Sequence, residues 1–235
     1  MMKINQVWNK KSYKMFLDYL ISIGNDKTKE FNKKIIDTKY EMLGIKMGEL
    51  RALAKDISKT DIMTFFDEST DTYYEEVMIQ GIVISYIKDP QEFEEYFNRF
   101  ILKIDCWGLS DSCVASYKIM KKYDFSSKAN LLIYSNSEYL QRVGYLIYLN
   151  YYIDDEHIND IYHLATIPSD YYYVNMAISW LLATCFTKYR PMILDLLKSK
   201  ELSPFVQNKT ITKIRESLVV NNKDKELVNK YKIKN

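Results

Sequence analysis

A tryptophan and an aspartate in the segment DCWGLSDS have the types and spacing to bind a positively charged group. Trp107 and Asp111 lie four residues apart, which places both side chains on one face of a helix. The face of an indole attracts a cation, and a carboxylate beside it neutralises the charge. The alternative is a core tryptophan followed by an aspartate that the helix dipole favours in the first turn. The spacing alone favours this second interpretation.

An arginine and a second tryptophan stand out in two later apolar segments. Arg142, in SEYLQRVGYLIYLNYY, is flanked by Leu140 and Val143, so its planar guanidinium could reach into a groove and hold a phosphate. It could equally pair with an acid on a neighbouring element. Trp180, in YYYVNMAISWLLATCF, is by itself more typical of a core residue.

The chain lacks the residues for several common chemistries. It contains neither a Walker-type phosphate loop nor a Gly-rich dinucleotide motif. Its two histidines, His157 and His163, do not share a helix face, which argues against a metal site or a Ser-His-Asp set. Cys106, Cys113 and Cys185 show no CxxC spacing and are typical of reduced thiols packed between helices. We therefore expect a function that needs no metal and no cofactor.

The elements that position these residues are predicted to be helices. Glycine (6) and proline (4) are scarce among the 235 residues, which favours long helices with short connections over a sandwich or barrel. Early helices are expected over residues 10–23, 26–36 and 47–57. Candidate N-caps then precede long apolar helices every 32 to 34 residues: Asp71, Asp105, Ser137, Asp170 and Ser203. Second helices are expected between them, near residues 90–102, 126–134, 154–165 and 191–198.

A two-helix unit repeated at this period is typical of an α-solenoid, or superhelix, because each pair buries its apolar face only against the next pair. We expect one all-α domain over residues 1–235. It would have N-terminal capping helices in 1–60, repeats in 61–218 and a C-terminal helix or tail in 219–235. The candidate residues above come from the first helices of three consecutive units, so they could converge on one groove.

The net charge of +2 is unevenly distributed. Lys and Arg exceed Asp and Glu by 6 in residues 1–60 and by 4 in residues 201–235, whereas acids exceed bases by 8 in residues 61–200. Basic ends could bind a polyanion, although composition alone favours ordinary solvated surface. No apolar run reaches the length of a membrane span, and the first residues contain no apolar leader, so we expect a cytoplasmic protein that does not enter a membrane.

Five segments, in order, are similar to motifs of the DNA alkylation repair (AlkD-like) family. IDCWGLSD (104–111) resembles its W-x-x-x-D motif, LQRV (140–143) its arginine motif and VNMAISWLLA (174–183) the segment of its second tryptophan. LGIKMGELRALAKDI (43–57) resembles a leucine-rich segment, and NKTITKIRES (208–217) a basic helix near the family's end. Each match is short, and the shared order over roughly residues 31–217 gives the resemblance its specificity.

The resemblance implies an all-α fold of HEAT-like repeats that wraps duplex DNA with alkylated bases. It also implies a DNA N-glycosylase that removes positively charged N3- or N7-alkylated purines without metal or cofactor. The residues that match the family's catalytic positions are Asp111, Trp107 and Trp180. The DNA-binding residues would be Arg142, Lys209, Lys213 and Arg215. We expect the protein to act as a monomer.

A second hypothesis assumes the same fold and no catalytic activity. The acidic balance of residues 61–200 is unfavourable for a groove that faces DNA. The chain would then be a non-catalytic HEAT-like module that binds nucleic acid or a protein partner. Basic side chains clustered near Asp111 would favour the glycosylase, and an acidic or tyrosine-filled groove would favour the binding module.

Overall fold

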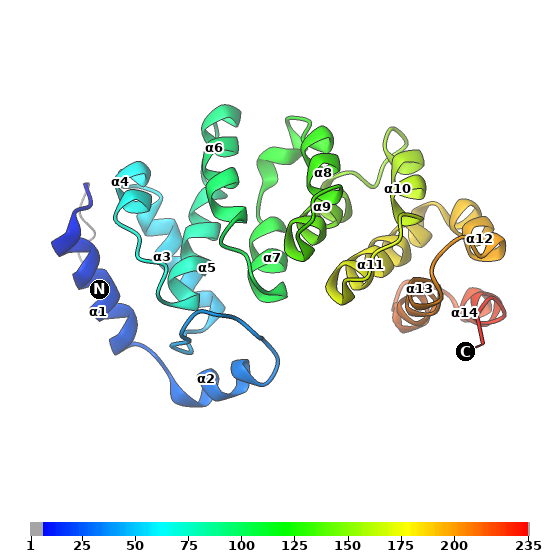
Figure 1. Ribbon diagram of the computed structural model, residues 1–235, viewed down its shortest axis with the longest axis horizontal. Helices are drawn as coiled ribbons and strands as arrows, with labels where there is room; N and C mark the ends of the chain where they lie inside the picture. Colours follow the sequence, from blue (N-terminus) through cyan, green and yellow to red (C-terminus); the bar gives the residue numbers. More distant parts are fainter. Residues whose placement is uncertain (1–6, 235) are drawn as a thin grey trace. The chain divides into compact units, whose positions relative to one another are not determined.

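A computed structural model of the chain describes residues 7–234 and consists of helices, as predicted (Figure 1). It divides into two compact units, one ending at Tyr123 and the other beginning at Asp124. The helices of the first unit are α1 (Lys10–Ser22), α2 (Asp26–Lys33), α3 (Met47–Ile57), α4 (Ile62–Asp67), α5 (Tyr74–Ile84), α6 (Pro90–Ile101), α7 (Trp107–Val114) and the 3-10 helix η1 (Lys118–Lys121). Those of the second are α8 (Ser126–Ile133), α9 (Glu138–Tyr151), α10 (Ile158–Ala165), α11 (Tyr172–Lys188), α12 (Arg190–Ser199), α13 (Pro204–Glu216) and α14 (Asn222–Asn229).

In the first unit, α5 is the central helix and packs against α3, α6 and α7. Every residue of α5 is buried. After the first turn its sequence, YEEVMIQGIVI, is apolar on all sides apart from Gln80, as expected for a helix surrounded by others. Gly81 allows α6 and α7 to come close, because a Cβ at this position would overlap Phe100 of α6 and Cys113 of α7.

Two buried carboxylates at the start of α5 fix two loops. Glu75 accepts hydrogen bonds from the backbone N–H groups of residues 43–45, at 2.6 to 3.3 Å. Glu76 accepts from the backbone N–H groups of residues 70–72 and from the Tyr13 hydroxyl at 2.6 Å. Their charge is compensated by these donors and by the N-terminal end of the helix dipole. Both loops are therefore held against the helix that α7 packs on.

In the second unit, α11 packs against α9 and α13, and α8 packs against α9. Gly144 permits the close approach of α9 to α8, since a Cβ here would collide with the carbonyl oxygen of Ala129. Two tyrosines of α9 use their hydroxyls to tie neighbouring helices: Tyr145 donates to the Leu164 carbonyl of α10 at 2.8 Å, and Tyr148 donates to Asn130 of α8 at 2.8 Å. The tyrosines thus act here as core residues with hydrogen-bonded ends.

Most of the predicted helices are confirmed within a few residues. Segment 47–57 matches α3 at both ends, and segments 10–23, 90–102 and 126–134 match α1, α6 and α8 closely. Segment 154–165 forms a helix only from Ile158, because Asp154 caps the turn before it by accepting from His157 N–H at 3.0 Å. Helix α4 was not predicted, because its six residues are too few for a helical repeat of apolar positions to stand out.

Two of the five predicted N-caps are confirmed, Ser137 and Ser203, and Ser203 accepts from the Val206 N–H at 3.3 Å. The other three are wrong, because the helices begin one or two residues later than expected and are capped by Tyr73, Cys106 and Tyr171. Asp71 and Asp105 bind side chains and loops of other segments instead: Asp71 accepts from Lys103 Nζ at 2.8 Å. A carboxylate in a loop can accept hydrogen bonds from residues far along the chain, and the spacing of residues in the sequence does not show such contacts.

Within residues 7–234, no helix is both long and apolar enough to cross a membrane. The prediction about a leader falls partly on residues 1–6, which lie outside the described residues. The predicted extents of capping helices, repeats and tail (1–60, 61–218 and 219–235) stay predictions, as does the single domain.

Candidate functional site

The Trp107–Asp111 pair lies at the surface of the first unit and not in its core. Trp107 is the first residue of α7, Asp111 follows one turn later, and both side chains are half-buried. The indole Nε1–H of Trp107 donates to the carbonyl of Ile35 at 3.0 Å. Asp111 Oδ1 lies 3.0 Å from the hydroxyl of Ser110, which can donate to it. An aromatic face and a carboxylate are therefore presented together on one helix face.

The backbone around Trp107 is fixed by close packing. Gly108 sits so near the loop after α2 that a Cβ would lie 3.1 Å from Ile36 Cδ1 and would also crowd the Tyr74 hydroxyl. A larger side chain would push the start of α7 away from both neighbours. The N-cap residue, Cys106, is fully buried, and desolvation raises the pKa of its thiol to about 12. This thiol stays neutral at physiological pH and is not a nucleophile.

The second tryptophan, Trp180, also lies at the surface, with 42% of its residue area exposed. The expectation of a core residue at this position is wrong, because Trp180 occupies the outward face of a helix whose other faces pack on α9 and α13. Lys213 of α13 holds its ammonium 5.9 Å from the centre of the indole ring. This distance is within the range of a cation–π contact.

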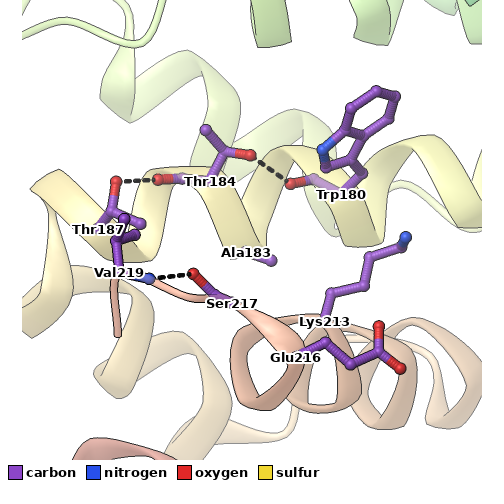
Figure 2. Close-up of a pocket in the computed structure, with 8 residues that line it drawn as sticks. All are labelled: Trp180, Ala183, Thr184, Thr187, Lys213, Glu216, Ser217 and Val219. Carbon is purple, nitrogen blue, oxygen red and sulfur yellow. Dashed lines mark hydrogen bonds between the residues drawn. The ribbon is translucent and has the colours of Figure 1, made fainter. Parts of the chain in front are cut away.

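Trp180 and Lys213 belong to a pocket of about 440 Å³ between α11 and the end of α13 (Figure 2). The pocket is lined by Trp180, Ala183, Thr184, Thr187, Lys213, Glu216, Ser217 and Val219. The hydroxyl of Thr184 donates to the Trp180 carbonyl at 2.9 Å, one turn back along α11. Figure 2 shows Lys213 extending from α13 toward the indole of Trp180, with the Glu216 side chain beside it on the same helix. The pocket thus combines an aromatic face with one cation and one carboxylate.

Arg142 is placed deep in the second unit. It is 5% exposed, and its Nη1 donates to the backbone carbonyl of Tyr173 at 2.6 Å. Its guanidinium also lies 6.0 Å from the centre of the Tyr173 ring. On the same helix, Glu138 accepts from the Tyr173 N–H at 2.9 Å. These contacts fasten α9 to the first turn of α11, the helix that carries Trp180.

The three basic residues of α13 do not act as one group. Lys209 and Lys213 are one turn apart and share a face, and Lys209 Nζ lies 5.9 Å from the Phe205 ring. Arg215 is exposed and points from a different face of the helix, outside the pocket. The structure therefore brings Lys213 together with Trp180, while Arg215 is separate. DNA binding by these residues and by Arg142 stays a prediction.

Two carboxylates that matter locally were missed as site residues. Asp105 was expected to be an N-cap, yet it accepts hydrogen bonds from Thr38 and Lys39. Glu216 lines the Trp180 pocket and was not singled out. Its position three residues after Lys213, on the same helix face, was the signal that could have found it.

In the described part of the chain, neither a metal-binding cluster nor a histidine stands at the candidate sites. No group of three or more His, Cys, Asp or Glu side chains in residues 7–234 is arranged to hold a metal ion. His157 is buried, and its Nδ1 lies 2.8 Å from Asp154, so it stabilises the turn before α10. The first unit thus offers the aromatic face and carboxylate of Trp107 and Asp111, and the second the aromatic face, lysine and carboxylate of the Trp180 pocket.

Each unit presents a tryptophan that is not buried beside a carboxylate, and an aromatic face beside a carboxylate can bind a cationic group. The family model of DNA alkylation repair enzymes matches residues 16–214. The chain therefore belongs to the DNA alkylation repair enzyme family, and the resemblance seen in the sequence is confirmed. A comparison with curated proteins found no match.

Proposed function

We propose that the protein is a DNA N-glycosylase that releases positively charged N3- or N7-alkylated purines from duplex DNA. The observation that carries this proposal is the half-buried pair of Trp107 and Asp111 on one face of α7, in a chain of the DNA alkylation repair family. Neither a metal nor a nucleophilic thiol is required for this reaction.

Cleavage of the glycosidic bond of an alkylated purine needs few catalytic groups. An alkylated purine carries a positive charge, so it leaves C1′ of the sugar with the electron pair of the glycosidic bond and becomes neutral. The sugar then carries the positive charge, and the carboxylate of Asp111 would stabilise it electrostatically. Water adds to C1′ and gives up a proton to Asp111 or to solvent. The face of Trp107 would hold the cationic nucleotide before the bond breaks, and Trp180 stays a candidate for a contact with the DNA.

DNA would be held mainly through its phosphates. Lys213 lies beside Trp180, so its ammonium would contact a phosphate close to the lesion, and Lys209 would contact one further along. Arg142 and Arg215 would supply further contacts. We also propose that the helix pairs of both units form one HEAT-like solenoid domain, acting as a cytoplasmic monomer on duplex DNA with alkylated bases.

The direct test is incubation with a duplex that contains 7-methylguanine, followed by measurement of the free base. We expect release above the spontaneous rate, with no dependence on added metal or chelator. Release equal to the spontaneous rate from protein that is folded by circular dichroism would rule out this activity.

The second candidate function is a non-catalytic module that binds nucleic acid or a protein. The burial of Arg142 and its bond to the Tyr173 carbonyl favour the protein-binding form of this module, because a fastened guanidinium has less freedom to hold a phosphate. Tight, salt-sensitive binding of the 7-methylguanine duplex without base release would support this function and exclude the enzyme.

A further inference from the structure

The indole of Trp107 is held in place from outside its own helix. The segment between α2 and α3, residues 34–46, runs past the start of α7 and supplies the Ile35 carbonyl that accepts from Trp107 Nε1–H. An indole at the first position of a helix has few neighbours on that helix to fix its side-chain rotation. This one hydrogen bond therefore decides which way the ring face points.

We propose that Asp105 is a positioning residue for the lesion site: its carboxylate fixes residues 35–39, and through the Ile35 carbonyl it fixes the orientation of the Trp107 indole. The inference rests on the proposed function, because that function places Trp107 in the lesion site. Asp105 itself touches no substrate in this arrangement.

The carboxylate of Asp105 gathers the hydrogen-bond donors of this loop. The hydroxyl of Thr38 lies 2.8 and 2.9 Å from its two oxygens, and the Lys39 N–H donates to Oδ2 at 2.7 Å. Asp105 and Trp107 are two residues apart, and so the loop and the start of α7 are joined at two points. At one point the Trp107 indole donates to the Ile35 carbonyl, and at the other Thr38 and Lys39 donate to the Asp105 carboxylate. Two such points prevent the loop carbonyl from sliding or turning relative to the indole.

The rest of the segment is anchored independently of Asp105. Glu75 holds residues 43–45, and the Tyr40 hydroxyl donates to the Lys103 carbonyl at 2.7 Å. Gly44 adopts a φ of 82°, a conformation that favours glycine, and so permits the turn that brings these N–H groups to Glu75. Ile35 and Ile36 are also tied to the end of α2, because their N–H groups donate to the Asn32 carbonyl at 3.0 and 2.9 Å. Removing the Asp105 carboxylate should therefore loosen residues 37–39 most, give the Ile35 carbonyl more freedom to turn, and leave the segment's other end in place.

The consequence for the proposed reaction is geometric. A cationic base must meet the indole face, and small misplacements of a positioning group reduce the rate of the chemical step more than they reduce binding. Loss of Asp105 should thus lower the rate of base release at saturating DNA by about ten-fold, with little change in affinity.

The experiment follows the three indole N–H signals in a ¹H–¹⁵N NMR spectrum of the intact protein, assigned with Trp107→Phe. Trp8 is an internal control, because its indole N–H donates to Thr60 at 2.9 Å in a buried aromatic cluster. In Asp105→Ala we expect the Trp107 signal to move and its hydrogen exchange to quicken, while the signals of Trp8 and Trp180 stay in place.

A matched control separates positioning from stability. Asp89 caps α6 in the same unit by accepting from two backbone N–H groups at 2.9 and 3.0 Å, far along the chain from Trp107. Asp89→Ala should cost similar stability and leave both the Trp107 signal and base release unchanged. Base release by Asp105→Ala should fall as stated above. A fall in melting temperature alone, with equal release by both variants, would overturn the proposal.

The outcomes distinguish this inference from the proposed function. A native protein that releases no base removes the proposed function, and the indole signals still decide whether Asp105 orients Trp107. An unchanged Trp107 signal in Asp105→Ala overturns the inference even if base release is present. Should Asp105→Ala fail to fold, Thr38→Val removes one donor and keeps the carboxylate. It must shift the Trp107 signal in the same direction, and no shift would also overturn the inference.

Discussion

The tryptophans of the two units' candidate sites are held in opposite ways. Trp107 is half-buried, begins its helix and has its indole N–H bound to a loop carbonyl, and that loop is itself anchored by carboxylates. Trp180 lies in the middle of a long helix with much of its ring exposed, and its neighbour is a flexible lysine from α13. The first is a fixed aromatic face and the second an adaptable one. In the proposed reaction, the fixed face would belong to the chemical step and the adaptable face to binding.

The largest expected effect comes from the carboxylate beside the fixed indole. Asp111→Asn keeps the shape of the side chain and removes the charge that would stabilise the sugar cation. Base release should fall by about ten- to a thousand-fold, whereas affinity for duplex should not decrease, because a carboxylate near phosphates opposes binding. Single-turnover release of 7-methylguanine measures this. Asp195→Asn, which alters an exposed carboxylate on α12, is the control and should release base at the native rate. Equal rates for both variants would remove Asp111 from the mechanism.

A second effect concerns how firmly the helix of Trp180 is held. Arg142→Ala removes the donor to the Tyr173 carbonyl and the buried stem that packs between α9 and α11. We expect a loss of about 1 to 3 kcal/mol in the free energy of unfolding, measured by urea titration. Arg99→Ala, which breaks an exposed ion pair with Asp67, should cost less than about 1 kcal/mol. If Arg142→Ala weakens DNA binding without this loss, the guanidinium acts on phosphate and not as an anchor.

The contrast between the tryptophans can be tested directly with phenylalanine, which keeps an aromatic face and loses the N–H. Trp107→Phe removes the bond to Ile35 and should cost about 0.5 to 1.5 kcal/mol of stability. Trp180→Phe breaks no hydrogen bond of its indole within residues 7–234 and should stay within about 0.5 kcal/mol of the native protein. Thermal melts of the two variants, side by side, measure the difference. Equal losses would contradict the distinction between a fixed and an adaptable face.

The helical class was predictable because glycine and proline are scarce and apolar residues recur at helical spacing, which are local properties. The same spacing placed Trp107 and Asp111 on one face of α7 correctly. What could not be predicted depends on partners far along the chain. Asp105 looked like a cap because it precedes an apolar run, and it binds a loop 66 or 67 residues away. Burial was equally hard to judge: taken by itself Trp180 is more typical of a core residue, yet it is exposed, and the sequence left open whether Arg142 holds a phosphate or a neighbouring element, whereas its side chain is buried.

The smallest expected effect comes from the lysine beside the adaptable indole. Lys213 makes no ion pair with a carboxylate in the described part of the chain, so in the proposed complex its ammonium is available for a phosphate. Lys213→Gln should weaken binding of damaged and undamaged duplex alike, because a phosphate contact carries no information about the base. The slope of log K against log salt should become shallower by about 0.9, the value for one released counterion. Lys198→Gln, on the exposed side of α12, provides the control and should leave the slope unchanged. A loss confined to the 7-methylguanine duplex would instead show that Lys213 helps to orient Trp180 on the lesion.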